Sequence, residues 1–477
     1  MLKHSLQKLC GHRLIFNRLF SEKRGEYAVL NYQDVQHFEQ LIGKSNVLTE
    51  DLDPYNVDFM KWYKGKSQCV LTPESADQVS AIIRHCYQRK LAIVPQAGNT
   101  GLVGGSVPVH DEIILSVRKI KKHFKLHEEA GILECDAGFT LHELDERLEP
   151  HNYIMPIDLG ARGSCCIGGN IATNAGGIRL IRYGSLVANV LALQVVIPDD
   201  KGSIFNLGTN LRKDNSDVRQ LPLFIGSEGQ FGIITRASIL VAPKPISTNL
   251  AFLGTDSFEN CVEILRAARR FLENVNMDNV LKSSPPFNLL IESSGFNVDH
   301  DLEKMAAFVD YCVPQDSDKR DGKPATEGIS PTNETEVAYL WKLRENASLA
   351  LNFDGYVYKH DLSLPLPYFY KLTEAVRERL KGTNTKRIVT FGHVGDGNTH
   401  LNITSEKYDQ EISDKLYPFI YEWVCERGGS ISAEHGIGRL KRVYHHKLVP
   451  KVQQELNSKI KRSYDPHLIL SPYKMID

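Results

Sequence analysis

Residues 160–177 read Gly-Ala-Arg-Gly-Ser-Cys-Cys-Ile-Gly-Gly-Asn-Ile-Ala-Thr-Asn-Ala-Gly-Gly, and this stretch decides the expected fold. Its six glycines are interleaved with isoleucine and alanine, which is typical of a packed loop and not of a flexible linker. A second stretch, Pro95-Gln-Ala-Gly-Asn-Thr-Gly-Leu-Val-Gly-Gly-Ser106, follows an apolar run that predicts a strand. Glycine lets backbone N–H groups approach a ligand, and consecutive N–H groups bind anions. Two such stretches predict one extended cofactor that carries phosphate groups.

A third stretch has the same character: residues 226–234 read Gly-Ser-Glu-Gly-Gln-Phe-Gly-Ile-Ile. None of the three has the G-x-G-x-x-G spacing that opens a helix in a Rossmann dinucleotide-binding domain. Considered singly, each stretch is also compatible with tight structural turns.

Composition narrows the class of protein. The chain has 477 residues, enough for about three domains or lobes. Lys plus Arg is 57 and Asp plus Glu is 58, so the net charge is 57 − 58 = −1, which disfavours a nucleic-acid binder. No apolar run approaches the ~18 residues of a membrane-spanning helix. The nine cysteines are widely spaced without a C-x-x-C, which argues against a disulfide framework and a cysteine-based zinc site.

The N-terminus has the pattern of a mitochondrial presequence. Residues 1–21 contain basic side chains but no Asp or Glu, and the first acid is Glu22. Apolar residues recur at helical spacing between the basic ones: Leu2, Leu6, Leu9, Phe16 and Phe20. An amphipathic, acid-poor segment of this kind predicts a transit peptide, with a solvated N-terminal helix as the alternative.

Short strands alternate with helices and glycine loops up to about residue 242, and Pro243 and Pro245 mark a boundary. Thr72 is the expected N-cap of the first clear helix. The expected strands are 91–94, 113–117, 132–137, 191–197, 223–225 and 233–241. Beyond the boundary, helices are expected at 258–273, 333–351 and 365–380, and an exposed loop at 313–330. The fold class is therefore α+β.

The stretch from Thr390 to Asn402 carries most of the chemistry. Turn residues Gly395–Asn398 predict a hairpin in which His393 faces His400, with Asn402 on the same face. Glu434, in a later Ser-Ala-Glu-His-Gly-Ile-Gly motif, could complete a set of two His and one carboxylate. Such a set also fits hydrolytic zinc or non-haem iron sites, and two polar strand histidines are the plainest alternative.

Helical spacing places Arg344 and Ser348 on the same face as Trp341. A charge on an apolar helix face needs a partner, which is either a core carboxylate or a bound anion. Lys359 raises the same question from a strand-like run. Two cations near one site favour an anionic ligand, because Arg grips carboxylates with two hydrogen bonds.

The three glycine-rich stretches resemble the FAD-binding domain of the vanillyl-alcohol-oxidase and p-cresol-methylhydroxylase flavoproteins. Asn99 stands in a loop where covalent members carry His, so the resemblance implies non-covalent FAD. It implies cofactor contacts from Pro95, Gly98, Asn99, Thr100, Gly101, Leu102, Gly104, Gly105, Ser106, Gly163, Ser164, Gly168, Gly169, Asn170, Thr173, Asn174, Gly176, Gly177, Glu228, Gly232 and Ile233.

With the histidine motifs added, residues from about 40 to 477 resemble the family of mitochondrial D-2-hydroxyglutarate dehydrogenases. The resemblance implies Zn²⁺ ligands at His393, His400 and Glu434, a general base at His435, which also contacts substrate, and further substrate contacts at Arg344, Ser348, Lys359 and Asn402. In this scheme zinc lowers the pKa of the 2-hydroxyl, His435 takes its proton, and hydride passes from C2 to flavin N5.

The implied architecture is a two-lobed p-cresol-methylhydroxylase-type FAD-binding domain followed by an α+β substrate-binding domain of the FAD-linked oxidase C-terminal type. We expect a presequence at 1–21, an arm at 22–62, the FAD-binding domain at 63–243 and the substrate- and metal-binding domain at 244–477. The resemblance implies the mitochondrial matrix and electron transfer flavoprotein as acceptor. Three alternatives stay open: a D-lactate or glycolate dehydrogenase, a two-His-one-Glu zinc hydrolase, and a non-catalytic relative.

Overall fold

The computed structural model describes residues 23–272, 275–279, 285–315, 322–331 and 333–476. The chain forms two compact units. The first contains the described residues up to Gly177, then Ser185–Pro243 and the chain from Glu434 onward; the second contains Ile178–Gly184 and Lys244–Ala433. The expected presequence lies outside the described residues.

The first unit is built on two main sheets. One has the strand order β1-β2-β4-β3, with β1 at Val47–Leu48, β2 at Val70–Leu71, β4 at Ile113–Ser116 and β3 at Ile93–Gln96. The other is antiparallel in the order β5-β6-β10-β8-β9: Phe124–His127, Ile132–Asp136, Ile233–Leu240, Val190–Val196 and Ile204–Gly208. A short pair joins β7, Tyr153–Ile154, to β11, Ala242–Pro243.

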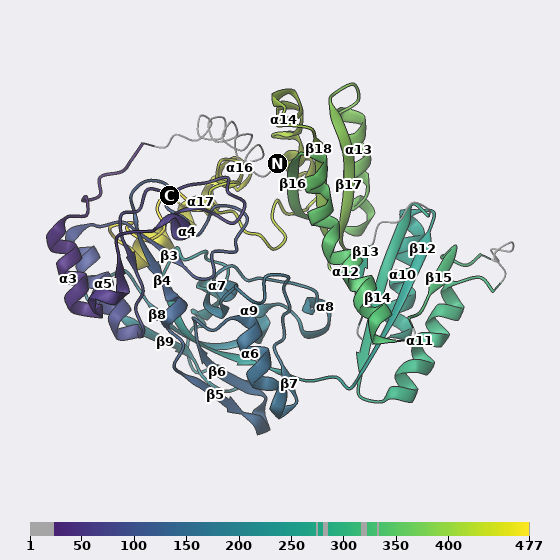
Figure 1. The fold of residues 1–477 in the computed structure, drawn as a ribbon, viewed down its shortest axis with the longest axis horizontal. Helices are drawn as coiled ribbons and strands as arrows, with labels where there is room; N and C mark the ends of the chain where they lie inside the picture. The colour runs from purple at the N-terminus through teal and green to yellow at the C-terminus, as the bar shows by residue number, and fades with distance from the viewer. Residues whose placement is uncertain (1–22, 273–274, 280–284, 316–321, 332, 477) are drawn as a thin grey trace. The chain divides into compact units, whose positions relative to one another are not determined.

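Helices cover these sheets (Figure 1): α3 Tyr32–Ile42, α4 Asp53–Asn56, α5 Ala76–Arg89, α6 Leu141–Leu148, α7 Ile167–Ala172, α9 Leu186–Asn189, α16 Arg442–Leu448 and α17 Lys451–Tyr464. Short 3-10 turns complete the unit: Lys44–Asn46, Val117–Lys119, Glu128–Ala130, Glu149–His151 and Leu221–Leu223. The strand expected at 223–225 is wrong, because the turn Leu221–Leu223 begins with a proline at its second position and leads into the glycine-rich third stretch.

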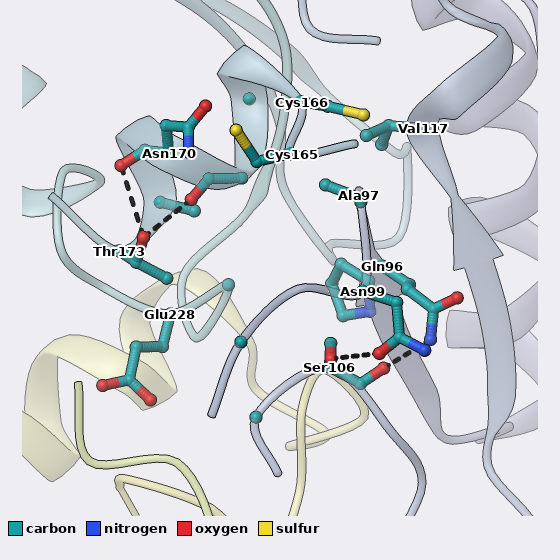
Figure 2. Close-up of a pocket in the computed structure, with 18 of the residues that line it drawn as sticks. Gln96, Ala97, Asn99, Ser106, Val117, Cys165, Cys166, Asn170, Thr173 and Glu228 are labelled. Atoms are coloured by element: carbon teal, nitrogen blue, oxygen red, sulfur yellow. Dashed lines mark hydrogen bonds between the residues drawn. The ribbon is translucent and has the colours of Figure 1, made fainter. Parts of the chain in front are cut away.

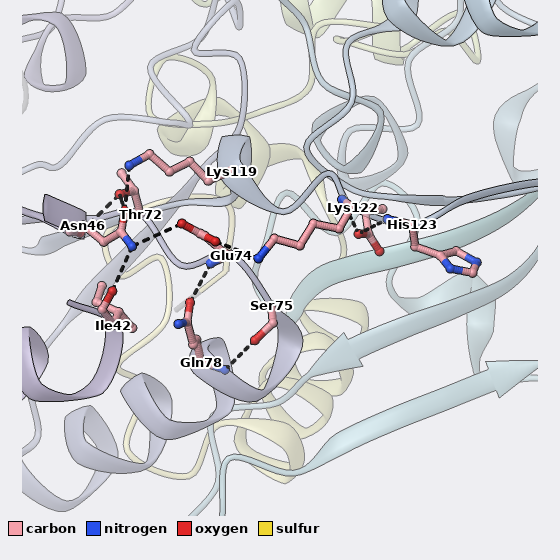
Figure 3. Close-up of polar contacts among 10 residues, drawn as sticks. Ile42, Asn46, Thr72, Glu74, Ser75, Gln78, Lys119, Lys122 and His123 are labelled. Carbon is pink, nitrogen blue, oxygen red and sulfur yellow. Dashed lines mark hydrogen bonds and ion pairs between the residues drawn. The ribbon is translucent and has the colours of Figure 1, made fainter.

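The N-cap of α5 is Ser75 and not the expected Thr72. The Ser75 hydroxyl accepts a hydrogen bond from the N–H of Gln78, and the Gln78 side chain accepts one from the N–H of Glu74 (Figure 3). Thr72 instead bonds Asn46 through both its N–H and its hydroxyl. The helix therefore begins later than expected, because Thr72 still extends strand β2 and bonds to Asn46.

The C-terminal segment is part of the first unit. Ile93 in β3 donates its N–H to Ile469 and accepts the N–H of Ser471, so the chain end runs parallel to the strand that precedes the first glycine-rich stretch. Asp465 stabilises this segment by accepting the N–H groups of Ile469 and Leu470. Packing thus joins the chain from Glu434 onward to the first unit. The domain boundary between residues 243 and 244, with a single domain at 244–477, remains a prediction.

The second unit holds one sheet, in which the strands follow the order β15-β12-β14-β13-β17-β18-β16. The strands are Glu327–Ile329, Ser247–Thr255, Phe287–Gly295, Val275–Asn279, Thr385–His393, Asn398–Ser405 and Tyr356–Ser363. Among the described residues, all strand pairings in this sheet are antiparallel. The α+β class is therefore confirmed.

Helices cover both faces of this sheet (Figure 1): α8 Leu180–Tyr183, α10 Phe258–Phe271, α11 Val298–Cys312, α12 Glu334–Ala350, α13 Lys371–Arg379, α14 Gln410–Leu416 and α15 Phe419–Cys425, with 3-10 turns at Leu351–Asp354 and Leu366–Tyr368. Alternate β12 residues point to opposite faces. Ala251 and Leu253 pack with α10 and α11, whereas Leu250 and Phe252 pack with Leu340 of α12.

Helix α12 therefore covers one face of the sheet. Trp341, Arg344 and Ser348, which helical spacing places on one face of α12, lie on the side toward the sheet. The helix expected at 365–380 divides into a 3-10 turn and α13, and β15 occupies the end of the expected 313–330 loop. Among the described residues, no helix is long and apolar enough to span a bilayer.

Candidate functional site

One pocket of the first unit is lined by all three glycine-rich stretches (Figure 2). Most of the residues assigned to the cofactor line it: Pro95, Gly98, Asn99, Thr100, Gly101, Gly105, Ser106, Gly168, Gly169, Asn170, Thr173, Glu228, Gly232 and Ile233. The other assigned residues lie in the same stretches but not in the pocket wall: Leu102, Gly104, Gly163, Ser164, Asn174, Gly176 and Gly177.

The backbone of the first stretch is suited to an anion. Within the described chain, the N–H groups of residues 98–106 donate to no protein acceptor. A run of free N–H groups in a loop forms a concave site for phosphate oxygens. The pocket can therefore hold the pyrophosphate of a dinucleotide such as FAD.

Close packing of the first two stretches explains the glycine at position 98. A Cβ atom there would lie 2.2 Å from the carbonyl oxygen of Ser164, which is far inside van der Waals contact. Ala97 has a negative φ, and its methyl group faces Gly169, where a Cβ would lie 2.7 Å away. The alanine at position 97 is thus accommodated by the missing side chain of Gly169.

The side chain of Asn99 has a structural use. Its Nδ2 donates to the carbonyls of Pro54 and Val57, and its Oδ1 accepts a hydrogen bond from the Ser106 hydroxyl at 2.7 Å (Figure 2). Asn99 has a φ of 54°, a left-handed conformation that asparagine tolerates. These bonds fix the two ends of the loop to each other and to the segment at α4.

Several residues of the pocket wall were not predicted from the sequence: Gln96, Ala97, Val103, Val117, Cys165, Cys166, Ala172, Gly229 and Ile234. Most are neighbours of assigned residues and could have been found by extending each stretch. Val117 comes from another segment and carried no local signal. Cys165 and Cys166 are free thiols, and burial raises the pKa of Cys166 to about 11, so it stays protonated at neutral pH.

His435 lines this same pocket, and Glu228 lies beside it in the wall. The Glu228 carboxylate accepts the N–H groups of Ile437 at 2.6 Å and Gly438 at 2.7 Å. Burial raises the pKa of Glu228, while the two N–H groups oppose that shift. Glu434, next to His435, accepts the N–H of Gly177 at 3.2 Å. The motif 434–438 is therefore fixed to the second and third glycine-rich stretches.

In the second unit, the hairpin of β17 and β18 brings two histidines together, but its expected register is wrong by two residues. His393 pairs with Asn398, and His400 pairs with Phe391. A two-residue shift keeps both side chains on one face of the sheet. The ring centroids of His393 and His400 lie 5.8 Å apart, so both imidazoles could bind one metal ion.

Asp361 belongs to this cluster and was missed in the sequence. It pairs with His400 across β16 and β18, and its Oδ1 lies 3.9 Å from His400 Nδ1. Its Oδ2 accepts hydrogen bonds from the N–H of Ala433 and the hydroxyl of Ser432. The available signal was alternation: Asp361 is two residues after Lys359 on the same strand and so shares its face.

The expected cations lie on this face. Lys359 pairs with Asn402 across the strands, and its Nζ donates to the Ser348 hydroxyl at 3.3 Å. Burial lowers the pKa of Lys359. The Arg344 guanidinium lies 5.8 Å from the centroid of Phe391. Arg344, Ser348, Lys359, Asn402, His393 and His400 thus gather on the α12 side of one sheet, where they are suited to an anionic ligand and a metal ion.

Comparisons with known proteins identify an FAD-binding domain and an FAD-linked oxidase C-terminal domain in this chain. Residues 67–208 match the FAD binding domain family, and residues 244–475 match the C-terminal domain of FAD linked oxidases. The chain is 42% identical to mitochondrial D-2-hydroxyglutarate dehydrogenase of Bos taurus, over 95% of this chain and 85% of that protein. It is 40% identical to a putative mitochondrial D-lactate dehydrogenase of Schizosaccharomyces pombe, over 94% and 91% of the two chains.

Among solved structures, p-cresol methylhydroxylase with bound substrate superposes with a TM-score of 0.73 at 18% identity, covering 93% of this chain and 96% of that one. This similarity concerns the fold alone. It confirms the expected p-cresol-methylhydroxylase type of FAD-binding fold, joined to an FAD-linked oxidase C-terminal domain.

Proposed function

The chain belongs to the D-2-hydroxyglutarate dehydrogenase family of FAD-linked oxidoreductases, and we propose that it oxidises D-2-hydroxyglutarate to 2-oxoglutarate. The observation that carries the proposal is His435, a potential base in the wall of the glycine-lined pocket. The cations Arg344 and Lys359, on one face of the second unit, support a substrate with two carboxylates.

The residues have distinct roles in this reaction. FAD, bound without a covalent link, would supply the acceptor for the hydride that leaves the substrate C2. His435 removes the proton of the 2-hydroxyl as general base. Arg344 holds the distal carboxylate, and Lys359, oriented by the Ser348 hydroxyl, holds the same anion with Asn402 beside it. The residues that were assigned to the cofactor and line the glycine-rich pocket hold the flavin and its phosphates.

His393, His400 and Glu434 are proposed as ligands of Zn²⁺. The 5.8 Å separation of the two rings supports this set, and Asp361 adds a carboxylate whose Oδ1 lies 3.9 Å from His400 Nδ1. A zinc ion held by these residues would supply Lewis-acid polarisation of the substrate hydroxyl, whose proton His435 removes.

Arg344→Leu tests the substrate assignment. Loss of a charge-assisted hydrogen bond costs about 1.5–3 kcal/mol, so the KM for D-2-hydroxyglutarate should rise about 10- to 100-fold. The KM for D-lactate, which lacks the distal carboxylate, should change little. Steady-state kinetics with an artificial electron acceptor measures both.

An exposed arginine on α10, Arg266, provides the control, since Arg266→Leu removes the same charge away from the proposed site. Equal losses on both substrates would remove the distal-carboxylate role from Arg344. A wild-type preference for D-lactate would favour the second candidate function, D-lactate oxidation, which the relative from Schizosaccharomyces pombe supports.

The physiological setting is also a proposal. The names of the relatives and the basic, acid-poor residues 1–21 support the mitochondrion, and we assign the matrix and electron transfer flavoprotein as acceptor on the family resemblance. Reoxidation of the substrate-reduced enzyme by purified electron transfer flavoprotein tests the acceptor. Reoxidation no faster than by oxygen alone would contradict it.

A further inference from the structure

Lys474, near the end of the chain, is buried against the first glycine-rich stretch. Its side chain is 1% exposed, and its Nζ donates to the carbonyl oxygen of Gly105 at 2.6 Å. Gly105 lines the pocket. A cationic group therefore lies directly behind the loop that is suited to phosphate.

This ammonium group has no counter-ion in the described part of the chain, because no carboxylate there lies within 4.0 Å of its nitrogen. The charged groups that face it at longer range are Glu112, Glu228 and Arg439. Lys461, another buried lysine of the first unit, differs: its Nζ lies 2.8 Å from the Asp465 carboxylate. A buried charge is stable only when it is compensated, so Lys474 calls for an anion on the ligand side.

The peptide between Gly105 and Ser106 connects Lys474 to the pocket. A trans peptide directs its N–H opposite to its C=O. With the Gly105 carbonyl bound by Lys474, the N–H of Ser106 is turned away from the lysine. That N–H is one of the loop donors without a protein acceptor among the described residues.

We infer that Lys474 is a cofactor-binding residue, which supplies the positive charge for the FAD pyrophosphate from behind the loop and orients the Ser106 N–H toward it. The lysine acts on the phosphates through the Gly105–Ser106 peptide. This role rests on FAD as the cofactor and is independent of the proposed substrate.

The role makes FAD affinity depend on pH. Burial lowers the pKa of Lys474 to about 7; Glu112 and Glu228 oppose this shift and Arg439 adds to it. Lys474 is charged below this pH, where FAD binds tightly. Bound phosphate raises the pKa of Lys474 above this value. The affinity for FAD should therefore fall as pH rises from about 7 toward the higher pKa of the complex.

Binding of FAD and of riboflavin to the full-length protein stripped of flavin, followed by fluorescence from pH 6 to 8.5, tests the inference. At pH 6, Lys474→Met should bind FAD about tenfold more weakly than wild type. Its affinity for riboflavin, which has no phosphate, should stay within about twofold of wild type. Lys474→Arg should bind FAD tightly and lose the pH dependence, because arginine stays charged throughout.

Glu112→Gln is a second variant that leaves the lysine in place. Removal of a carboxylate that raises the pKa of Lys474 should start the weakening of FAD binding at lower pH. Unchanged FAD affinity in Lys474→Met, an equal loss for FAD and riboflavin, or a pH dependence that persists in Lys474→Met would each overturn the inference. None of these measurements uses a substrate, so a wrong substrate assignment would not affect them.

Discussion

Glu228 connects the cofactor pocket to the proposed base. Its carboxylate lines the pocket and accepts two backbone N–H groups, from Ile437 and Gly438, just after His435. A carboxylate can accept both bonds, whereas a carboxamide offers one oxygen and directs an NH₂ group at the second donor. Glu228 is therefore a positioning residue for the His435 loop as well as a wall of the pocket.

Replacement of Glu228 by Gln should slow flavin reduction. The unmet N–H group costs about 1–3 kcal/mol in the native loop conformation, so the rate constant for reduction by D-2-hydroxyglutarate should fall about 5- to 150-fold. Loss of the Glu228 charge also lowers the pKa of Lys474, so the rate is measured at pH 6 with FAD in excess, where the FAD content should match that of wild type. Anaerobic stopped-flow absorbance and the flavin-to-protein ratio measure the two quantities.

Asp199→Asn is a control for loss of a carboxylate charge alone, since Asp199 accepts the backbone N–H groups of Lys201 and Ser203 through a single oxygen, Oδ1, in a turn of the first unit, and asparagine keeps that oxygen. The same loss of rate in both variants would indicate a general effect on stability and would contradict the positioning role. A pH profile of reduction that keeps its shape in Glu228→Gln would also count against it, because a displaced His435 changes its environment.

Single residues were predictable from sequence where local spacing determines a face. Arg344 and Ser348 follow helical spacing, and the structure has them on one side of α12 near Lys359. Asp361 and Lys474 were not singled out, because their importance comes from pairings with residues far along the chain. His400 gives Asp361 its role, and Gly105 gives Lys474 its role.

At the scale of elements, the hairpin β17–β18 shows which part of a turn the sequence specifies. Its glycines and asparagine predict a loop, but the loop begins one residue earlier than expected, at Val394. Gly397 takes a φ of 78° at the last loop position and donates its N–H to the carbonyl of His393. Turn composition alone did not distinguish the two closures, whereas the alternation of faces survived the shift.

His400→Ala tests the metal role of this hairpin. Loss of one of three protein ligands should reduce zinc from about one per chain to a small fraction. Elemental analysis of the purified full-length protein gives the metal content, and the flavin spectrum serves as the check on folding. Exposed His300, at α11 in the same unit, is the control: His300→Ala should keep its zinc. Full zinc content in His400→Ala would exclude His400 as a ligand.

The whole molecule places segments from both ends of the chain in the first unit. Residues 434–477 return to the sheet that carries the first glycine-rich stretch, and they bring His435 to the pocket wall and Lys474 behind it. The glycine-rich stretches predicted the cofactor pocket from sequence. The return of the C-terminal segment was not predictable, because β3 recognises it by backbone hydrogen bonds that leave no residue pattern.

In the proposed reaction, substrate C2 delivers hydride to a flavin in this pocket. The most direct test is the visible spectrum of the purified protein under anaerobic conditions, before and after addition of D- or L-2-hydroxyglutarate. We expect a flavin spectrum that bleaches with the D isomer and persists with the L isomer. A flavin that neither isomer reduces, or a folded protein without flavin, would contradict it.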